Sequence, residues 1–292
     1  MKMKYRQTIV ENIGIEIDEF VPGYSHNDGI SFRNGEQEPV HQMMEVMVPF
    51  LIDQYRRVHY NAGVTNNLKY ILDVGSGPGG LAYFFRKYDP NLIVFTLDGN
   101  QETINSPYID KDTHFVVRTD QEYKLVDENE NIIKFDLIVC IEHIEHIQES
   151  NFRQFLKNLG AHAHEDTLFF GTAATWEYES DDEKHIHCNV KSADEWRGYL
   201  YQNRELFKAA ATITLSEWAM KFIDHSQSFS QETTSLATVF DTFEAPLIVK
   251  CLIGYFLITE KHPKTHDEHR QHAALESWTH RFAGSTIILL GF

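Results

Sequence analysis

The stretch "KYILDVGSGPGG", residues 69–80, decides which fold we expect. Its first half is apolar, as in a strand buried on both faces, and its second half is a glycine-rich turn. The segment "LAYFFRKYD", residues 81–89, follows with helical character. Glycines let the backbone turn sharply and approach a ligand, because they carry no Cβ atom that would clash. The order strand, glycine turn and helix therefore predicts an α/β unit with a ligand at the turn.

The same alternation continues along the chain. Further strands are expected at "NLIVFTLDGN" (91–100), "HFVVRTD" (114–120), "FDLIVCIE" (135–142) and "DTLFFGTAA" (166–174), with a helix at "NFRQFLKNLGAHA" (151–163). These apolar runs lack the alternation of polar and apolar residues that marks a half-exposed strand. They predict an α/β fold with a parallel sheet covered on both faces. Farther on, Ser192 and Glu195 have the spacing of a capping box at a helix start, and 207–215 and 247–261 are candidates for a sixth and a seventh strand.

Composition limits the class of protein. The 292 residues are 42% hydrophobic and 13% aromatic, which is enough for one large, elaborated domain. Acidic residues outnumber Lys and Arg by 43 to 26, and the net charge of −17 argues against a nucleic-acid partner. Three widely spaced cysteines make no disulfide framework, and the polar start shows no signal peptide. With no apolar stretch of membrane-spanning length, we expect a cytoplasmic protein without a membrane partner.

Three parts of the chain are expected. Residues 1–60 are interpreted as an N-terminal extension or substrate lid, because much of this part is rich in loop-forming residues. Residues 61–262 are interpreted as the core, with an aromatic-rich insertion at 215–246. Residues 263–292 are interpreted as a histidine-rich C-terminal tail. The sequence leaves the oligomeric state open.

Acidic residues stand at the ends of the first three strands. Asp73 precedes the glycines, Asp98 ends the second strand and Asp120 ends the third. An acid at the end of the second strand can accept hydrogen bonds from both hydroxyls of a ribose. A side chain at the end of the third strand can meet an adenine amine. The glycine turn by itself would also suit a dinucleotide site.

Together, "DVGSGPGG", Asp98, Asp120 and "FDLIVCIEHIEH" resemble the class I S-adenosylmethionine-dependent methyltransferases, over roughly residues 68–261. The resemblance implies a Rossmann-like, doubly wound sheet of seven strands, of which the last is antiparallel. It also implies that S-adenosylmethionine is the cofactor and that the following residues bind it. Gly75, Gly77 and Gly79 would line its methionine part, and Asp73 and Ser76 of the same segment would also bind the cofactor. Asp98 would hold the ribose, and Asp120 the edge of the adenine.

The segment "CIEHIEHI", residues 140–147, is the candidate metal site. In a helix, Glu142, Glu145 and His146 would share one face, while His143 would point elsewhere. The later segment "HIHCN" could add His187 or His185, which would complete a set of ligands for Mg²⁺ or another divalent cation. The alternative is that the acids favour a helix N-terminus and that His146 packs beneath the cofactor.

The Glu-x-x-Glu-His pattern resembles three methyltransferase groups. These are the ubiquinone-pathway O-methyltransferases, the sugar- and natural-product-modifying enzymes, and the small-RNA 3′-terminal 2′-O-methyltransferases. The resemblance and the acidic charge favour O-methylation of a small-molecule or glycan hydroxyl, with His143, His146 or His185 as candidate catalytic residues. An RNA 2′-O-methyltransferase is the alternative that the charge opposes. A non-catalytic module that binds S-adenosylmethionine is a further one.

Overall fold

A computed structural model describes four continuous segments of the chain, residues 6–9, 68–174, 187–214 and 286–292. Between residues 44 and 59 it also describes 44, 47–49, 51, 52, 55, 56 and 59. The insertion predicted at 215–246 and the strand predicted at 247–261 lie outside them.

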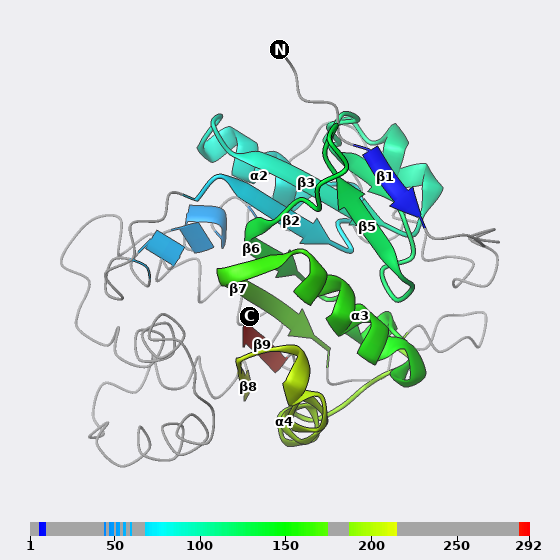
Figure 1. Cartoon of the computed structure of the whole chain (residues 1–292), viewed down its shortest axis with the longest axis vertical. Helices are drawn as coiled ribbons and strands as arrows, with labels where there is room; N and C mark the ends of the chain where they lie inside the picture. The colour runs from blue at the N-terminus through cyan, green and yellow to red at the C-terminus, as the bar shows by residue number, and fades with distance from the viewer. Residues whose placement is uncertain are drawn as a thin grey trace.

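A mixed sheet forms the centre of the described structure (Figure 1). Five parallel strands build most of it: β2 (Tyr70–Val74), β3 (Ile93–Asp98), β4 (His114–Val116), β6 (Phe135–Cys140) and β7 (Ala163–Ala173). Two more strands, β8 (Ala209–Thr214) and β9 (Thr286–Gly291), complete a seven-stranded order of β4-β3-β2-β6-β7-β9-β8. Because β9 runs antiparallel to both β7 and β8, the predicted Rossmann-like sheet with one antiparallel strand is confirmed.

The helices lie between the strands in the chain. They are α2 (Gly80–Tyr88), α3 (Glu149–Ala161) and α4 (Ala193–Gln202), with shorter 3₁₀ turns η3 (Gln101–Asn105), η4 (Ile144–His146) and η5 (Arg204–Leu206). The capping box predicted for α4 is present, since Ser192 Oγ accepts a hydrogen bond from the Glu195 N–H and the Glu195 carboxylate accepts one from the Ser192 N–H. A separate antiparallel pair joins β1 (Arg6–Ile9) to β5 (Tyr123–Val126).

One face of the sheet is covered by α3 and α4, which lie in front of it in Figure 1. The core on this face is apolar and contains several aromatic rings. From the helices it includes Phe152, Phe155, Leu156, Leu159, Trp196 and Leu200, and from the strands Leu72, Val74, Ile138 and Phe169. All six residues of β6 are buried, which explains why its sequence shows no polar alternation.

The strand order reverses between β2 and β6. From β2 the chain builds outward through β3 and β4, and it then returns to the other side of β2 to form β6 and β7. In open parallel sheets, ligands bind outside the carboxyl ends of the strands at such a reversal point. The loops after β2, β3, β4 and β6 all meet there, so this edge is where a functional site is expected.

The antiparallel strand comes from an unexpected part of the chain. We expected residues 247–261 to be the seventh strand and 263–292 to be a tail. In the structure, residues 286–291 pair with β7 on one side and with β8 on the other. Both segments are apolar and of strand length, and periodicity does not show which apolar run pairs with a given edge. The rest of the predicted division into 1–60, 61–262 and 263–292 stays a prediction.

No helix in the described part of the chain combines the length and the apolar character that crossing a lipid bilayer requires.

A buried histidine joins β5, β6 and α3. His162 follows α3 and is completely buried. Its Nδ1 lies 2.9 Å from the Ile133 carbonyl oxygen, and its Nε2 accepts a hydrogen bond of 3.3 Å from the Leu125 N–H. This arrangement holds the neutral imidazole with the proton on Nδ1, because Nε2 must stay free to accept. Burial, helped by the charge of Lys134, lowers the pKa of His162 to about 4.

We expect His162 to make the fold sensitive to acid. The unfolded chain takes up a proton near pH 6.5, whereas the folded chain resists it down to about pH 4. Between these values the contribution of His162 falls with falling pH, by at most roughly 1.4 kcal/mol per pH unit. The free energy of unfolding of wild type should therefore approach that of His162→Gln between pH 6.5 and pH 5, as measured by urea denaturation. A difference that stays constant over this range would contradict the assignment.

Candidate functional site

The glycine turn after β2 has the backbone that its sequence predicts. Gly75, Gly77 and Gly79 have φ angles of 71°, 51° and 80°, which residues other than glycine rarely adopt. The N–H groups of Gly75 and Ser76 both donate to the Leu97 carbonyl at the end of β3, over 2.8 and 2.9 Å. The loop is thereby held against the neighbouring strand.

Asp98 fixes the same loop from β3. Its carboxylate accepts one hydrogen bond of 2.8 Å from the Gly77 N–H and another of 2.8 Å from the Asn100 N–H. Each carboxylate oxygen has more than one acceptor direction, so both oxygens could still accept from a ribose hydroxyl. The structure therefore places Asp98 beside the glycine loop, with acceptor directions left over for the predicted bonds to a ribose.

Asp73 is the buried acid in front of the loop. Burial, together with the nearby charge of Asp98, raises the pKa of Asp73 to about 7. Within the described residues, its Oδ2 atom has no hydrogen-bond partner. An unpartnered buried oxygen is costly, which suits a position where a polar ligand completes the hydrogen bonding.

Asp120 lies in the loop after β4 and its carboxylate is already bound by other side chains. It accepts hydrogen bonds from Nε and Nη2 of Arg118, at 3.0 and 2.9 Å, and from Nδ2 of Asn151 at 2.9 Å. These contacts join the end of β4 to the first turn of α3. The expected contact of Asp120 with adenine stays a prediction, and it would have to use the remaining acceptor directions.

The segment after β6 does not form a helix over residues 142–146, which was the condition for the shared face. Glu142 has a φ of 48°, and only Ile144–His146 form a short 3₁₀ turn, η4. The Glu142 N–H donates to Oγ1 of Thr172 on β7, over 2.9 Å, which holds the chain in this left-handed turn. The idea that Glu142, Glu145 and His146 share one helix face is therefore wrong. A left-handed backbone at a residue other than glycine is strained, and such strain is often found at functional sites.

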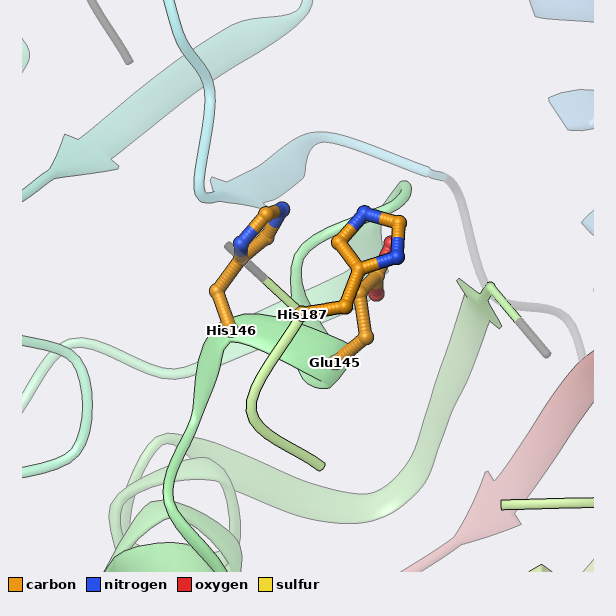
Figure 2. Close-up of side chains that lie close together, drawn as sticks. All are labelled: Glu145, His146 and His187. Atoms are coloured by element: carbon orange, nitrogen blue, oxygen red, sulfur yellow. The ribbon is translucent and has the colours of Figure 1, made fainter. Parts of the chain in front are cut away.

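Three side chains nevertheless converge at this point. One possible ligand atom from each of Glu145, His146 and His187 lies within 4.8 Å of the others. Figure 2 shows Glu145 and His146 on the η4 turn and His187 on a separate segment, with the three side chains pointing the same way. Backbone hydrogen bonds bring the segments together, because the N–H groups of Cys188 and Asn189 both donate to the Glu145 carbonyl, each over 2.9 Å.

Glu145 is the unusual member of this cluster. Its side chain is completely buried, and neither carboxylate oxygen makes a hydrogen bond of good geometry within the described structure. The backbone N–H groups of Glu145 and Ala174 are near enough to lower its pKa slightly, but they do not satisfy the carboxylate. Burial raises the pKa of Glu145 well above its usual range, and the charge of Glu142 raises it further. A divalent cation would compensate such a carboxylate, and one oxygen with two imidazole nitrogens suits Zn²⁺, Mn²⁺ or Fe²⁺ as well as Mg²⁺.

The other predicted ligands and catalytic residues are placed differently. Glu142 is close enough to raise the pKa of Glu145, but it is not one of the three converging residues. The ring of His143 turns toward Gly75 and Thr119, with its centroid 6.4 Å from that of His146. His185 lies outside the described residues. Their roles as ligands or catalytic groups stay predictions.

Sequence reasoning missed the polar residues that hold the site together. Thr172 fixes Glu142, Thr119 meets His143, and Asn158 Nδ2 donates to the carbonyls of Thr119 and Gln121. Each makes a contact between segments far apart in the chain, so no local spacing predicts it. Asn158 alone could have been suspected from the sequence, because it is a polar amide on the buried side of α3.

The comparison with protein families agrees with this geometry. A family model described as a methyltransferase domain matches residues 50–233, which is more than half of the chain. The chain therefore belongs to this methyltransferase family, within the class I S-adenosylmethionine-dependent methyltransferases.

Individual relatives are similar over shorter stretches. The sphingolipid C9-methyltransferase of Komagataella phaffii is 32% identical over 123 residues, 38% of this chain and 25% of that protein. The ubiquinone biosynthesis O-methyltransferase of Rickettsia typhi is 29% identical over 131 residues, 44% of this chain and 49% of that protein. The chain thus spans half or less of these curated relatives. The solved structure of the plantazolicin methyltransferase BamL aligns over 85% of this chain and 84% of its own, at 10% identity and a TM-score of 0.49.

We expect the glycine loop not to tolerate a side chain at Gly75. A Cβ atom there would lie 2.2 Å from Cγ of His143, and the left-handed backbone costs roughly 1–2 kcal/mol for alanine. Gly75→Ala should therefore weaken binding of S-adenosylhomocysteine at least tenfold in calorimetry and lower the unfolding temperature.

Gly198→Ala is the matched control for this loop variant. Gly198 lies in α4, and a Cβ atom there would meet nothing within 4 Å. This variant should bind like wild type and be equally or more stable, because alanine favours a helix. Wild-type affinity in Gly75→Ala would contradict the role of the loop.

Proposed function

We propose that this protein transfers a methyl group from S-adenosylmethionine to a hydroxyl oxygen of a small-molecule or glycan acceptor, with a divalent cation at Glu145, His146 and His187. One observation carries the proposal. The completely buried Glu145 carboxylate makes no hydrogen bond of good geometry among the described residues and stands beside two imidazoles. These groups lie at the carboxyl edge of the sheet, where the glycine loop also lies.

The described residues fit the cofactor. S-adenosylmethionine supplies an activated methyl group on a positively charged sulfur. The glycine turn offers a backbone without side chains for close approach, and Asp98 offers carboxylate oxygens beside it. The unpartnered oxygen of Asp73 is a further acceptor at this edge. We propose that these residues hold the cofactor outside β2 and β3.

The cluster after β6 is suited to the acceptor. In the reaction a C–S bond breaks while a C–O bond forms, and the acceptor hydroxyl loses its proton. The chain must hold that oxygen in line with the methyl group and provide a route for the proton. A cation on Glu145, His146 and His187 would act as a Lewis acid that lowers the pKa of a bound hydroxyl. Without a cation, the half-exposed His146 is our candidate to accept the proton.

The class of acceptor follows from charge and from similarity. The net charge of −17 disfavours an RNA backbone, because phosphates would be repelled. The relative in Rickettsia typhi is described as an O-methyltransferase of ubiquinone biosynthesis, and its similarity supports transfer to oxygen. We therefore place a neutral hydroxylated molecule ahead of a polynucleotide.

Removal of one imidazole tests the cation. His187→Gln should weaken binding of Mn²⁺, measured by calorimetry, by at least tenfold, because one of three protein ligands is lost. The matched control is His164→Gln, since His164 lies at the start of β7 and contacts Asp136 instead of the cluster. Equal Mn²⁺ affinity in wild type and His187→Gln would contradict the metal site.

Transfer of a labelled methyl group tests the reaction itself. We expect wild type to label small hydroxylated acceptors in a panel of phenols and sugars, and EDTA should abolish the labelling. If EDTA leaves turnover unchanged, the cation is excluded while methyl transfer stands. Label found on RNA 3′ ends, and lost when the acceptor is oxidised with periodate beforehand, would overturn the proposed acceptor. Absence of S-adenosylmethionine binding would contradict the proposed methyltransferase function as a whole.

A further inference from the structure

His143 occupies a position between three strand ends. It follows β6, it contacts the loop after β2 through Gly75, and it contacts the loop after β4 through Thr119. In the strand order, β2 and β6 are neighbours, whereas β4 lies two strands farther from β6 than β2 does. The His143 side chain therefore joins loops that the sheet itself does not join directly.

The ring fills the space beneath Gly75. The position of a Cβ atom on Gly75 would be 2.2 Å from Cγ and 2.4 Å from Nδ1 of His143. The imidazole thus packs directly against the backbone of the first loop glycine. On the other side, the loop is fixed by the Leu97 carbonyl and by the Asp98 carboxylate. The loop is held between β3 on one side and the His143 ring on the other.

The far side of the ring is also engaged. Nε2 of His143 and Oγ1 of Thr119 share a hydrogen bond of 2.8 Å. Thr119 is itself fixed, because Asn158 Nδ2 donates to its carbonyl over 2.9 Å. Nε2 is thus engaged by Thr119, and Nδ1 lies beside the backbone of Gly75. A general base needs an unengaged nitrogen that faces the acceptor, and the Thr119 contact occupies Nε2.

We propose that His143 is a positioning residue for the cofactor and not a base for the acceptor. Its ring packs against Gly75 and bonds Thr119, and in this way fixes the position of the glycine loop. This inference rests on the proposed binding of S-adenosylmethionine at that loop. It predicts that loss of the contact weakens cofactor binding and leaves the proton transfer from the acceptor unchanged.

The test measures S-adenosylhomocysteine binding by calorimetry. His143→Leu keeps an apolar side chain beneath Gly75 but removes the bond to Thr119, and Thr119→Val removes the partner hydroxyl at the same size. Each should raise the dissociation constant on the order of tenfold, as expected for one buried hydrogen bond. The double variant should be no weaker than the single ones, because both remove the same contact. His143→Gln, whose amide can reach Thr119, should recover most of the affinity.

Several results would overturn this role. Wild-type affinity in Thr119→Val would do so, even if His143→Leu failed to fold. A second contradiction would come from His143→Leu if its dissociation constant were unchanged while its kcat fell. If the rise of kcat with pH were also lost, His143 would be acting as a base. The control His164→Gln, on β7 away from the loop, should bind like wild type. If wild type itself bound no S-adenosylhomocysteine, the proposed function would fail together with this inference.

Discussion

The Asp98 carboxylate makes the contact on which the rest of the site depends. It accepts hydrogen bonds from the N–H groups of Gly77 and Asn100, and so it ties the glycine loop after β2 to the end of β3. The left-handed glycines could adopt many conformations in a free chain, and an ordered loop must overcome that entropy. A buried carboxylate with two backbone donors supplies a directional, charge-assisted restraint. The loop then presents a defined surface at the point where the strand order reverses.

The second half of the site is built by backbone contacts across the chain. Glu145 stands on a short 3₁₀ turn, and its carbonyl accepts the N–H groups of Cys188 and Asn189. This pairing brings His187 beside Glu145 and His146, about forty residues away in the sequence. A completely buried carboxylate without well-formed hydrogen bonds destabilises the fold. In the proposed function, a cation held by this carboxylate and the two imidazoles would offset that cost.

Much of the sheet follows from the sequence because its information is local. The glycine turn, the apolar strands and the acid at Asp98 are all visible as patterns of neighbouring residues. Three features were not predictable in this way. The pairing of residues 286–291 with β7 and β8, the Thr172 bond to the Glu142 N–H, and the bond from Asn151 to Asp120 all depend on distant segments. Single-sequence periodicity carries no information about such contacts.

A crystal structure of the protein grown with S-adenosylhomocysteine and Mn²⁺ would show both halves of the site at once. We expect density for S-adenosylhomocysteine outside the carboxyl ends of β2 and β3, with Asp98 beside its ribose. We also expect an anomalous scattering peak among Glu145, His146 and His187. Two results would contradict these expectations. One is density for the nucleoside elsewhere on the molecule, and the other is a Glu145 carboxylate that is hydrogen-bonded to protein groups with no anomalous peak beside it.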